Sequence, residues 1–259
     1  MAQYIEVEQA IRMPGLRVVL TPGVPGPWTE AAKGILRVKQ IPYEKVRQEL
    51  MGENRPLINW TKQATAPVFV YNNERPRSLW SDQLFLAERL QPNPPLIPAD
   101  IGERMLMFGL ANELCGENGL GWARRLMIVR SSLADPSASE GAKKSTRFLG
   151  AKYDYSEPGA EAAPARVAQI LTTFNRQLEA QRKRGSRFLV GDHLTAVDLY
   201  WAAFAALIQP LPDNLCQMHP GFRKMYDCKD PVVNAASDPQ LFAHRDFVYH
   251  EYLELPVDM

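Results

Sequence analysis

The sequence has few of the features that mark several common classes of protein. It contains only three cysteines, Cys115, Cys216 and Cys228, and their spacing is neither C-x-x-C nor typical of a metal site. Such a sparse, odd set predicts a reducing cytoplasm and no disulfide framework. No apolar stretch approaches the roughly 18 residues of a membrane span. The segment Met1 to Gly15 lacks the apolar core of a secretory signal.

An excess of charge of one sign is also lacking. The chain has 30 basic and 29 acidic residues and a formal net charge of +1, so no global field favours nucleic acid or a membrane surface. The apolar fraction of 46% is enough for sizeable cores, and the 23% charged fraction is ordinary for a soluble protein. A length of 259 residues fits one large domain or two smaller ones.

The first 90 residues alternate short strands with helices. The pattern predicts strands at 16–20, 41–46 and 68–71, a possible paired strand at 77–80, helices at 29–40 and 82–90, and an irregular or briefly helical stretch at 53–62. Helices that cover a small sheet form an α/β unit. We therefore predict a first domain over 1–90, in which 1–14 is an N-terminal extension.

A proline-rich stretch at 91–98 follows this domain. Four prolines in eight residues favour a stiff, extended linker. Most of the chain after it, 99–259, has helical periodicity and is predicted to form an all-helical second domain. Its helices are expected near 105–115, 122–133, 166–184, 195–207 and 241–255. The Ser-, Gly- and Lys-rich stretch 134–164 is predicted to be a surface loop, with at most a short helix.

The string from Gly191 to Tyr200, GDHLTAVDLY, is the most specific in the chain. Thr195 and Asp198 have the spacing of a capping pair, in which each side chain accepts a backbone N–H at the start of a helix. The apolar residues that follow predict a buried helix, whose start must be satisfied from within the protein. Both residues are therefore expected to act as a structural N-cap.

This string resembles the run that opens a core helix in the soluble glutathione transferase superfamily. Ile41-Pro42-Tyr43-Glu44, Ala66-Pro67-Val68 and Trp80-Ser81-Asp82 also stand where that family has its second strand, its cis-proline and its acid–serine pair. The resemblance spans roughly 16–249. It implies a thioredoxin-like N-terminal α/β domain that binds glutathione and an all-α C-terminal domain that binds a second substrate, with a homodimer as the expected assembly.

Ala66 and Pro67 open the strand 68–71. By itself, a proline at a strand start is either an ordinary trans loop residue or part of a cis turn. The resemblance implies a cis bond, with the N–H and C=O of Ala66 paired to the cysteinyl backbone of glutathione, an extended tripeptide.

Four more residues are implied in glutathione binding. Ser81 and Asp82 offer a hydroxyl, an acid and a helix start to the γ-glutamyl end. Their order is reversed relative to the family, and a shift of one residue would bring in Gln83; an ordinary helix N-cap is the alternative. Lys62 and Gln63 are the nearest candidates for the glycyl carboxylate.

The residue that activates the thiol is not where the family has it. Counting back from Ile41, the family's catalytic Ser or Cys falls at about Gly26, which has no side-chain donor. Without a cysteine in the first domain, disulfide-exchange chemistry is not expected. Thr29 at the helix start is the favoured catalytic residue. A backbone-only site and Thr21 stay open, and a plain N-cap is the structural alternative for Thr29.

The resemblance places a pocket for the second substrate between the domains. Its wall would come from Trp28, Met105, Phe108 and Asn112, an apolar surface with one amide that suits a hydrophobic electrophile. Core packing is the alternative for this stripe. Arg124, Arg125 and Arg130 either steer an anionic substrate or form a solvated helix face.

The expected function is that of a glutathione transferase. Bound glutathione would lose its thiol proton and attack a hydrophobic small molecule, since a thiolate is the stronger nucleophile. Two alternatives remain: a non-catalytic relative that binds ligands or assembles with proteins, and a glutathione-dependent lyase, etherase or isomerase. Glutathione is the expected co-substrate, and no metal, nucleic acid or membrane is expected.

Overall fold

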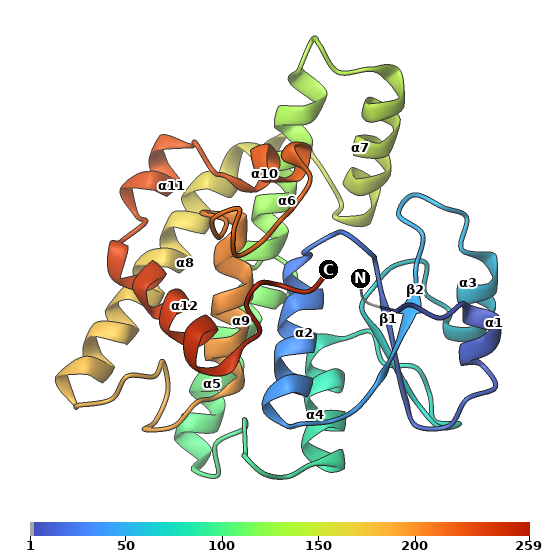
Figure 1. Ribbon diagram of the computed structural model, residues 1–259. Coiled ribbons are helices and arrows are strands. Elements are labelled where there is room, and N and C mark those ends of the chain that lie inside the picture. Colours follow the sequence, from blue (N-terminus) through green and yellow to red (C-terminus); the bar gives the residue numbers. More distant parts are fainter. Residues whose placement is uncertain (1–2) are drawn as a thin grey trace. The chain divides into compact units, whose positions relative to one another are not determined.

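The computed structural model describes residues 3–259, which divide into two compact units (Figure 1). The first two residues of the predicted extension 1–14 lie outside the described residues. Unit 1 takes in the chain up to Leu96 together with Leu211–Phe222 and Tyr249–Met259. Unit 2 comprises Ile97–Pro210 and Arg223–Val248. The division at Leu96 falls inside the stretch 91–98, and two later segments also belong to unit 1.

Unit 1 is built around a three-stranded sheet in the described part of the chain. Its elements are α1 (Val7–Ala10), β1 (Leu16–Leu20), α2 (Pro27–Val38), β2 (Glu44–Arg47), α3 (Arg55–Thr61), β3 (Val68–Tyr71) and α4 (Trp80–Leu90). The strand order is β2-β1-β3, with β1 parallel to β2 and antiparallel to β3. The central position of β1 explains why all five of its residues are buried.

The two faces of the sheet carry separate cores, because successive side chains of a strand point to opposite sides. Val19 and Val68 pack with side chains of α1 and α3. Val18 and Phe69 face the other way and pack with side chains of α2 and α4. In Figure 1, α2 and α4 lie on one side of the sheet and α1 and α3 on the other. The start of α2 is thereby held at the end of β1.

Most strands of the first domain are confirmed. Strands 16–20 and 68–71 are found as predicted, and the second strand is found slightly later, at Glu44–Arg47. The stretch 77–80 is not a strand: Arg77 exchanges two backbone hydrogen bonds of 2.9 Å with Phe69, and α4 begins at Trp80. Pro76 has no N–H to extend the pairing, and the helix start leaves no room for a longer strand.

Lys39 ties the proline-rich stretch to unit 1. Its side chain is fully buried, and its ammonium pairs with Glu88 at 2.7 Å. The same nitrogen donates to the carbonyls of Gln91 and Pro94, both at 2.8 Å. Three partners satisfy the three donors of an ammonium. The beginning of the linker is therefore anchored by a buried lysine.

Helices make up unit 2. They are α5 (Ile101–Cys115), α6 (Leu120–Ala134), α7 (Glu140–Lys152), α8 (Glu157–Lys183), α9 (Ala196–Phe204) with the 3-10 turn η1 (Ala205–Leu207), and α11 (Pro231–Ala235). Two further helices, α10 (Pro220–Tyr226) and α12 (Pro239–Tyr252), extend across the division between the units. Every residue of α9 is buried, which confirms the predicted central helix.

The predicted surface loop at 134–164 is wrong. It contains α7 and the first two turns of α8. Side-chain caps start both helices: Ser139 accepts from the N–H of Ala142, and Ser156 accepts from that of Gly159, each at 3.2 Å. The prediction depended on apolar periodicity, but within α7 only Gly150 is buried. Capping by serine compensates for the missing apolar stripe.

Candidate functional site

The loop before β3 presents an unpaired stretch of backbone. The Ala66–Pro67 bond is cis. Among residues 3–259, no group hydrogen-bonds to the N–H or the C=O of Ala66, which is half-buried. Backbone groups that are partly withdrawn from water need a partner. Ala66 therefore offers one donor and one acceptor to an extended peptide, as the resemblance implies.

Gln83 holds this loop in place. Its side chain is only 3% exposed. The amide nitrogen donates to the carbonyl oxygens of Pro67 at 3.1 Å and Arg77 at 3.2 Å. Gln83 is the fourth residue of α4, and it thus links the first turn of this helix to the loop before β3. From the sequence, Gln83 entered only through a possible shift of alignment, because a buried glutamine leaves no periodic signal.

Ser81 and Asp82 lie in the first turn of α4, but neither is its N-cap. Leu79 is the N-cap and makes no side-chain capping bond, so the plain N-cap alternative is wrong. The Ser81 hydroxyl has no hydrogen-bond partner within residues 3–259. Asp82 pairs with the exposed Arg75 at 3.0 Å. The helix start, the hydroxyl and the carboxylate are all available to the two charged groups of a γ-glutamyl end.

Lys62 and Gln63 follow the end of α3. Lys62 has a left-handed backbone with φ of 60°, and its ammonium donates to the carbonyl of Asn59 at 3.1 Å. The backbone N–H of Gln63 donates to the hydroxyl of Thr61 at 3.2 Å. The Lys62 side chain thus turns back over α3, and the glycyl-carboxylate role of both residues stays a prediction.

The start of α2 lacks a side-chain cap. Gly26 is the N-cap, Pro27 is the first helical residue, and Thr29 is the third, so Thr29 is not a plain N-cap. A Cβ placed on Gly26 would lie 3.6 Å from Oγ1 of Thr29. The Thr29 hydroxyl therefore stands beside the place where a serine or cysteine at position 26 would project. Within the described residues, the Thr29 N–H and hydroxyl have no acceptor or donor partner.

Thr21 is the less suitable hydroxyl. It donates to the side-chain oxygen of Gln48. Gln48 is 5% exposed, and its amide nitrogen donates to the carbonyls of Glu49 and Ala64 at 2.6 and 3.3 Å. Because its proton is already used in this network, Thr21 has a structural role at the end of β1.

The residues predicted for the second substrate fall in different units, and each is described by itself. Trp28 is half-buried in the first turn of α2. On α5, Met105 is 69% exposed, Asn112 is exposed, and Phe108 is half-buried with the guanidinium of Arg104 5.8 Å from its ring centre. The core face of α5 consists of Met107, Leu110, Ala111, Leu114 and Cys115. Core packing is therefore the wrong explanation for Met105 and Asn112.

The arginines of α6 have three different environments. Arg124 is 4% exposed and donates to the carbonyl of Leu207 at 2.8 Å, so the solvated-face alternative is wrong for it. Arg125 stacks on Tyr226, with 5.3 Å from guanidinium to ring centre. Arg130 is exposed and pairs with Glu157 at 2.6 Å. Arg124 holds backbone carbonyls in place, which is a structural function.

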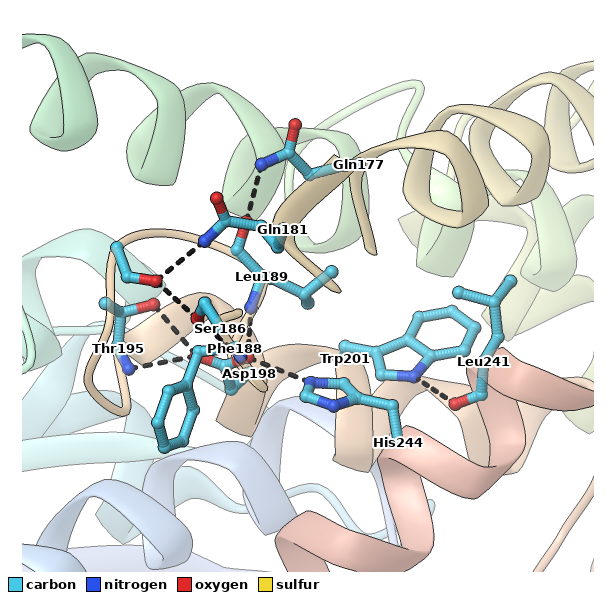
Figure 2. Close-up of polar contacts among 11 residues, drawn as sticks. Gln177, Gln181, Ser186, Phe188, Leu189, Thr195, Asp198, Trp201, Leu241 and His244 are labelled. Atoms are coloured by element: carbon cyan, nitrogen blue, oxygen red, sulfur yellow. Dashed lines mark hydrogen bonds and ion pairs between the residues drawn. The ribbon is translucent and has the colours of Figure 1, made fainter. Parts of the chain in front are cut away.

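A closed polar network surrounds the start of α9 (Figure 2). Asp198 is fully buried. Its Oδ2 accepts from the N–H of Thr195 at 2.9 Å and from its hydroxyl at 3.0 Å. Its Oδ1 accepts from the N–H of Leu189 and pairs with Nε2 of His244, both at 2.9 Å. The carboxylate thereby joins the loop before α9, the helix start and α12.

The loop that leads into α9 is fixed by α8. Gln177 donates to the carbonyl of Leu189 and Gln181 to that of Gly191, both at 2.7 Å (Figure 2). Gly191 has a φ of +67°, which a residue with a side chain adopts only with strain. The hydrogen bonds drawn in Figure 2 all join residues of unit 2, which supports a structural role for this string.

The thiols of the chain are poorly placed for chemistry. Cys115, Cys216 and Cys228 are all buried, and none of them forms a disulfide. Burial raises the pKa of the Cys115 thiol well above its ordinary value, whereas a reactive cysteine needs a lowered pKa. Within residues 3–259, no cluster of three or more His, Cys, Asp or Glu side chains is arranged to hold a metal ion. No helix in the same range is long and apolar enough to cross a membrane.

Comparisons with known proteins agree with this geometry. Residues 145–229 match the family model of the glutathione S-transferase C-terminal domain. No curated protein matches the chain in sequence. Among solved structures, a rice glutathione S-transferase in complex with glutathione is similar, with a TM-score of 0.59 and 16% identity over 95% of this chain and 94% of that one.

Two bacterial structures are similar to a comparable degree. A glutathione S-transferase from Methylobacterium radiotolerans, in complex with glutathione sulfonate, has a TM-score of 0.56 and 16% identity over 91% of both chains. A bacterial maleyl pyruvate isomerase of the zeta class has a TM-score of 0.51 and 16% identity over 92% of this chain and all of that one. At such identities the similarity establishes the fold.

Proposed function

We propose that this chain, which has the fold of the glutathione S-transferase superfamily and its C-terminal domain over residues 145–229, is a glutathione-dependent transferase. The resemblance read from the sequence and the predicted fold class are confirmed. Glutathione is the proposed co-substrate of the domain 1–90. A hydrophobic electrophile is the proposed ligand of the domain 99–259.

The unpaired backbone of Ala66 is the observation that carries this proposal. A peptide laid along the loop before β3 would gain two hydrogen bonds there without any rearrangement of the sheet. The loop is buttressed by Gln83, so its geometry is set before a ligand arrives. Ser81 and the start of α4 follow the same strand and supply groups for a γ-glutamyl end. The combination suits an extended peptide with a charged terminus.

Activation of the thiol is assigned to the start of α2. The N-terminal N–H groups of a helix and its dipole favour an anion, and the hydroxyl of Thr29 adds a donor beside Gly26. A donor to the thiolate lowers the pKa of the thiol. Thr29 is therefore the proposed catalytic residue, and a side chain at position 26 is not needed.

Calorimetry with glutathione, followed by ultraviolet absorbance of the thiolate against pH, tests the proposal. We expect glutathione to bind at millimolar concentration or below and the pKa of its thiol to fall on binding. If glutathione does not bind, the proposed co-substrate is wrong. If it binds with an unchanged thiol pKa, the protein is a binding relative without transferase chemistry.

An isomerase or lyase is a second candidate function. It is favoured by the similarity in fold to a zeta-class maleyl pyruvate isomerase. A transferase releases a glutathione conjugate, whereas an isomerase returns glutathione unchanged after each turnover. Mass spectrometry of the products from a panel of electrophilic substrates distinguishes the two, because only the transferase consumes glutathione.

A homodimer in the cytoplasm is the proposed assembly and location. On α5, Ile101 and Met105 are 68% and 69% exposed, and Leu106 is 41% exposed. Adjacent exposed apolar side chains of this kind mark contact surfaces. Three cysteines that form no disulfide fit a reducing compartment. Sedimentation of the wild type and of Met105→Glu separates a dimer contact from a substrate contact, since only the first changes the mass.

A further inference from the structure

We propose that unit 1 has a second small-molecule site, which binds a primary amine with a small apolar body in a cavity between α2 and the segment 249–258. The cavity has a volume of about 340 Å³. None of the residues predicted for glutathione lines it. This site is independent of the proposed transferase function.

The segment after α12 closes this cavity as a strap along α2 (Figure 1). The N–H of Val257 donates to the carbonyl of Leu215 at 2.8 Å. The ammonium groups of Lys33 and Lys45 both bond to Asp258, one to its carbonyl and the other to its carboxylate. A Cβ on Gly34 would lie only 2.8 Å from the side chain of Leu253. The strap is therefore fixed on α2 by polar contacts and by a close approach at a glycine.

The cations around the cavity are all paired. Lys33 bonds to Glu30 at 2.9 Å in addition to Asp258. Arg37 pairs with Glu254 at 3.5 Å, and Lys45, which lies in β2, pairs with Asp258. With these three cations already matched to carboxylates, the side chains of residues 3–259 around the cavity leave no unmatched positive charge for an anionic ligand. An anion is therefore the wrong ligand class.

Among the described residues that line the cavity, one buried side-chain oxygen has no hydrogen-bond partner, and it is an acceptor. The side chain of Glu30 is 10% exposed, and its Oε2 is held by Lys33. Its Oε1 is buried and, within residues 3–259, has no hydrogen-bond partner. A carboxylate oxygen left without a donor is costly. The carboxylate plane turns readily about its last torsion, so Oε1 would reach a donor that enters the cavity. An ammonium is the strongest such donor.

The rest of the cavity wall suits an apolar body. Ile41, Pro42, Leu253 and Val257 contribute aliphatic surface beside the rings of Tyr43 and Tyr249. Burial raises the pKa of the Tyr43 phenol, so this ring stays uncharged. A cavity with an aliphatic and aromatic wall and one charged anchor has the usual composition of a small-molecule site.

Proton release on binding gives the proposal a specific signature. Burial raises the pKa of the Glu30 carboxyl, opposed by Lys33. The other groups that act on it are Asp258, which raises this pKa, and Lys45, which lowers it. A bound ammonium would add a further positive charge and lower the pKa of Glu30 again. Binding of an amine should therefore release a proton from the protein.

Titration calorimetry with benzylamine, benzyl alcohol and benzoate tests the site. We expect benzylamine to bind, with a heat that depends on the ionisation enthalpy of the buffer because a proton is released. Benzyl alcohol should bind at least tenfold more weakly, and benzoate should not bind. Equal binding of the three compounds, or no binding of benzylamine at millimolar concentration, overturns the proposal.

Glu30→Gln should weaken the binding of benzylamine at least tenfold and abolish the proton release. Glu44→Gln is the matched control: it removes the same charge from an exposed position of β2 and should change nothing. Leu253→Trp, which fills the cavity and keeps Glu30, should also prevent binding, and circular dichroism shows whether each variant is folded. Saturating glutathione should leave the benzylamine affinity unchanged; competition, or full affinity in a folded Glu30→Gln variant, rules out the site.

Discussion

Two helix starts in this chain have opposite designs. At the start of α9, the carboxylate of the fully buried Asp198 accepts a hydrogen bond from the N–H of Thr195. The same carboxylate accepts one from the N–H of Leu189 and pairs with the ring of His244 (Figure 2). At the start of α2, the N-cap is a glycine, and within residues 3–259 the N–H and hydroxyl of Thr29 have no partner. A closed start stabilises a core, whereas an open start retains donors for a ligand.

The acids of the two first turns differ in the same way. Both carboxylate oxygens of Asp198 have hydrogen-bond partners inside unit 2. Glu30 has one oxygen on Lys33 and one without a partner in the described part of the chain. Both carboxylates lie where the helix dipole favours a negative charge. The difference shows that a helix start is structural or functional according to whether its groups are satisfied by the chain itself.

Removing the Asp198 carboxylate from the start of α9 should have the largest effect on stability. Asp198→Ala leaves the N–H of Leu189 and the groups of Thr195 and His244 without their acceptor in a dry site. We expect the free energy of unfolding to fall by about 3–5 kcal/mol, since one partner of a buried polar network is removed. Urea unfolding followed by circular dichroism measures it. Asp192→Ala, at a carboxylate 85% exposed, is the control and should stay within about 0.5 kcal/mol. A loss below 1 kcal/mol for Asp198→Ala would show that the network is not stabilising.

Removing the donor from the open start should affect catalysis instead of stability. Thr29→Val keeps the shape of the side chain and deletes its hydroxyl. We expect kcat/KM to fall about 100–1000-fold, as for loss of one donor to a developing anion, with glutathione affinity changed by less than about threefold. A conjugation assay and the pH dependence of thiolate absorbance measure the two effects. Thr29→Ser should retain activity, and full activity in Thr29→Val would remove this residue from the mechanism.

Glu30, whose carboxylate is only partly hydrogen-bonded, should make the free energy of unfolding depend on pH. Because burial raises the pKa of Glu30 above its ordinary value, folding favours its protonated form. The stability that this group contributes is complete below a pH of about 4.3, the ordinary value, and is lost as the pH rises through the folded pKa. Relative to Glu30→Gln, the wild type should therefore lose stability from pH 4.5 towards neutrality. Unfolding curves at several pH values measure this loss. A flat difference, or an equal slope for Glu44→Gln, contradicts it.

Placing a capping side chain at the start of α2 should have the smallest effect on stability. Gly26→Ser introduces a Cβ at an ordinary contact distance of 3.6 Å from the Thr29 hydroxyl. Serine and glycine differ by only a few tenths of a kcal/mol as N-caps, so the melting temperature should barely change. In the Thr29→Val background the new hydroxyl should restore part of the conjugation rate. Gly26→Ala in the same background is the control without a donor, and equal rates in both would exclude a hydroxyl role at this position.

Regular periodicity made much of the fold predictable. The short apolar runs at 16–20 and 68–71 predict strands, and the apolar face of 166–184 predicts a helix. The helix α7 was missed because it buries almost nothing and starts from the serine cap of Ser139. The short helix α1 was missed because its buried Val7 and Ala10 gain their role only from the sheet beside them.

The candidate site was predictable in part. Ala66, Pro67 and Ser81 became candidates through the resemblance to the glutathione transferase superfamily. Gln83 entered the sequence analysis only through a possible shift of alignment, and its role at the loop before β3 was not predicted, since its two hydrogen bonds join carbonyls that are distant along the chain. The strap at 249–258 was read only as part of a helical domain, because nothing in its own residues indicates a contact with α2.

The sequence by itself determined most of the strands and helices and the capped start of α9, since turn residues, periodicity and caps act over a few neighbouring positions. Only the tertiary structure decided which groups remain unpaired: the backbone of Ala66, the hydroxyl of Thr29 and one oxygen of Glu30. Whether a polar group is satisfied depends on what the rest of the chain brings to it, and that information is absent from any local pattern.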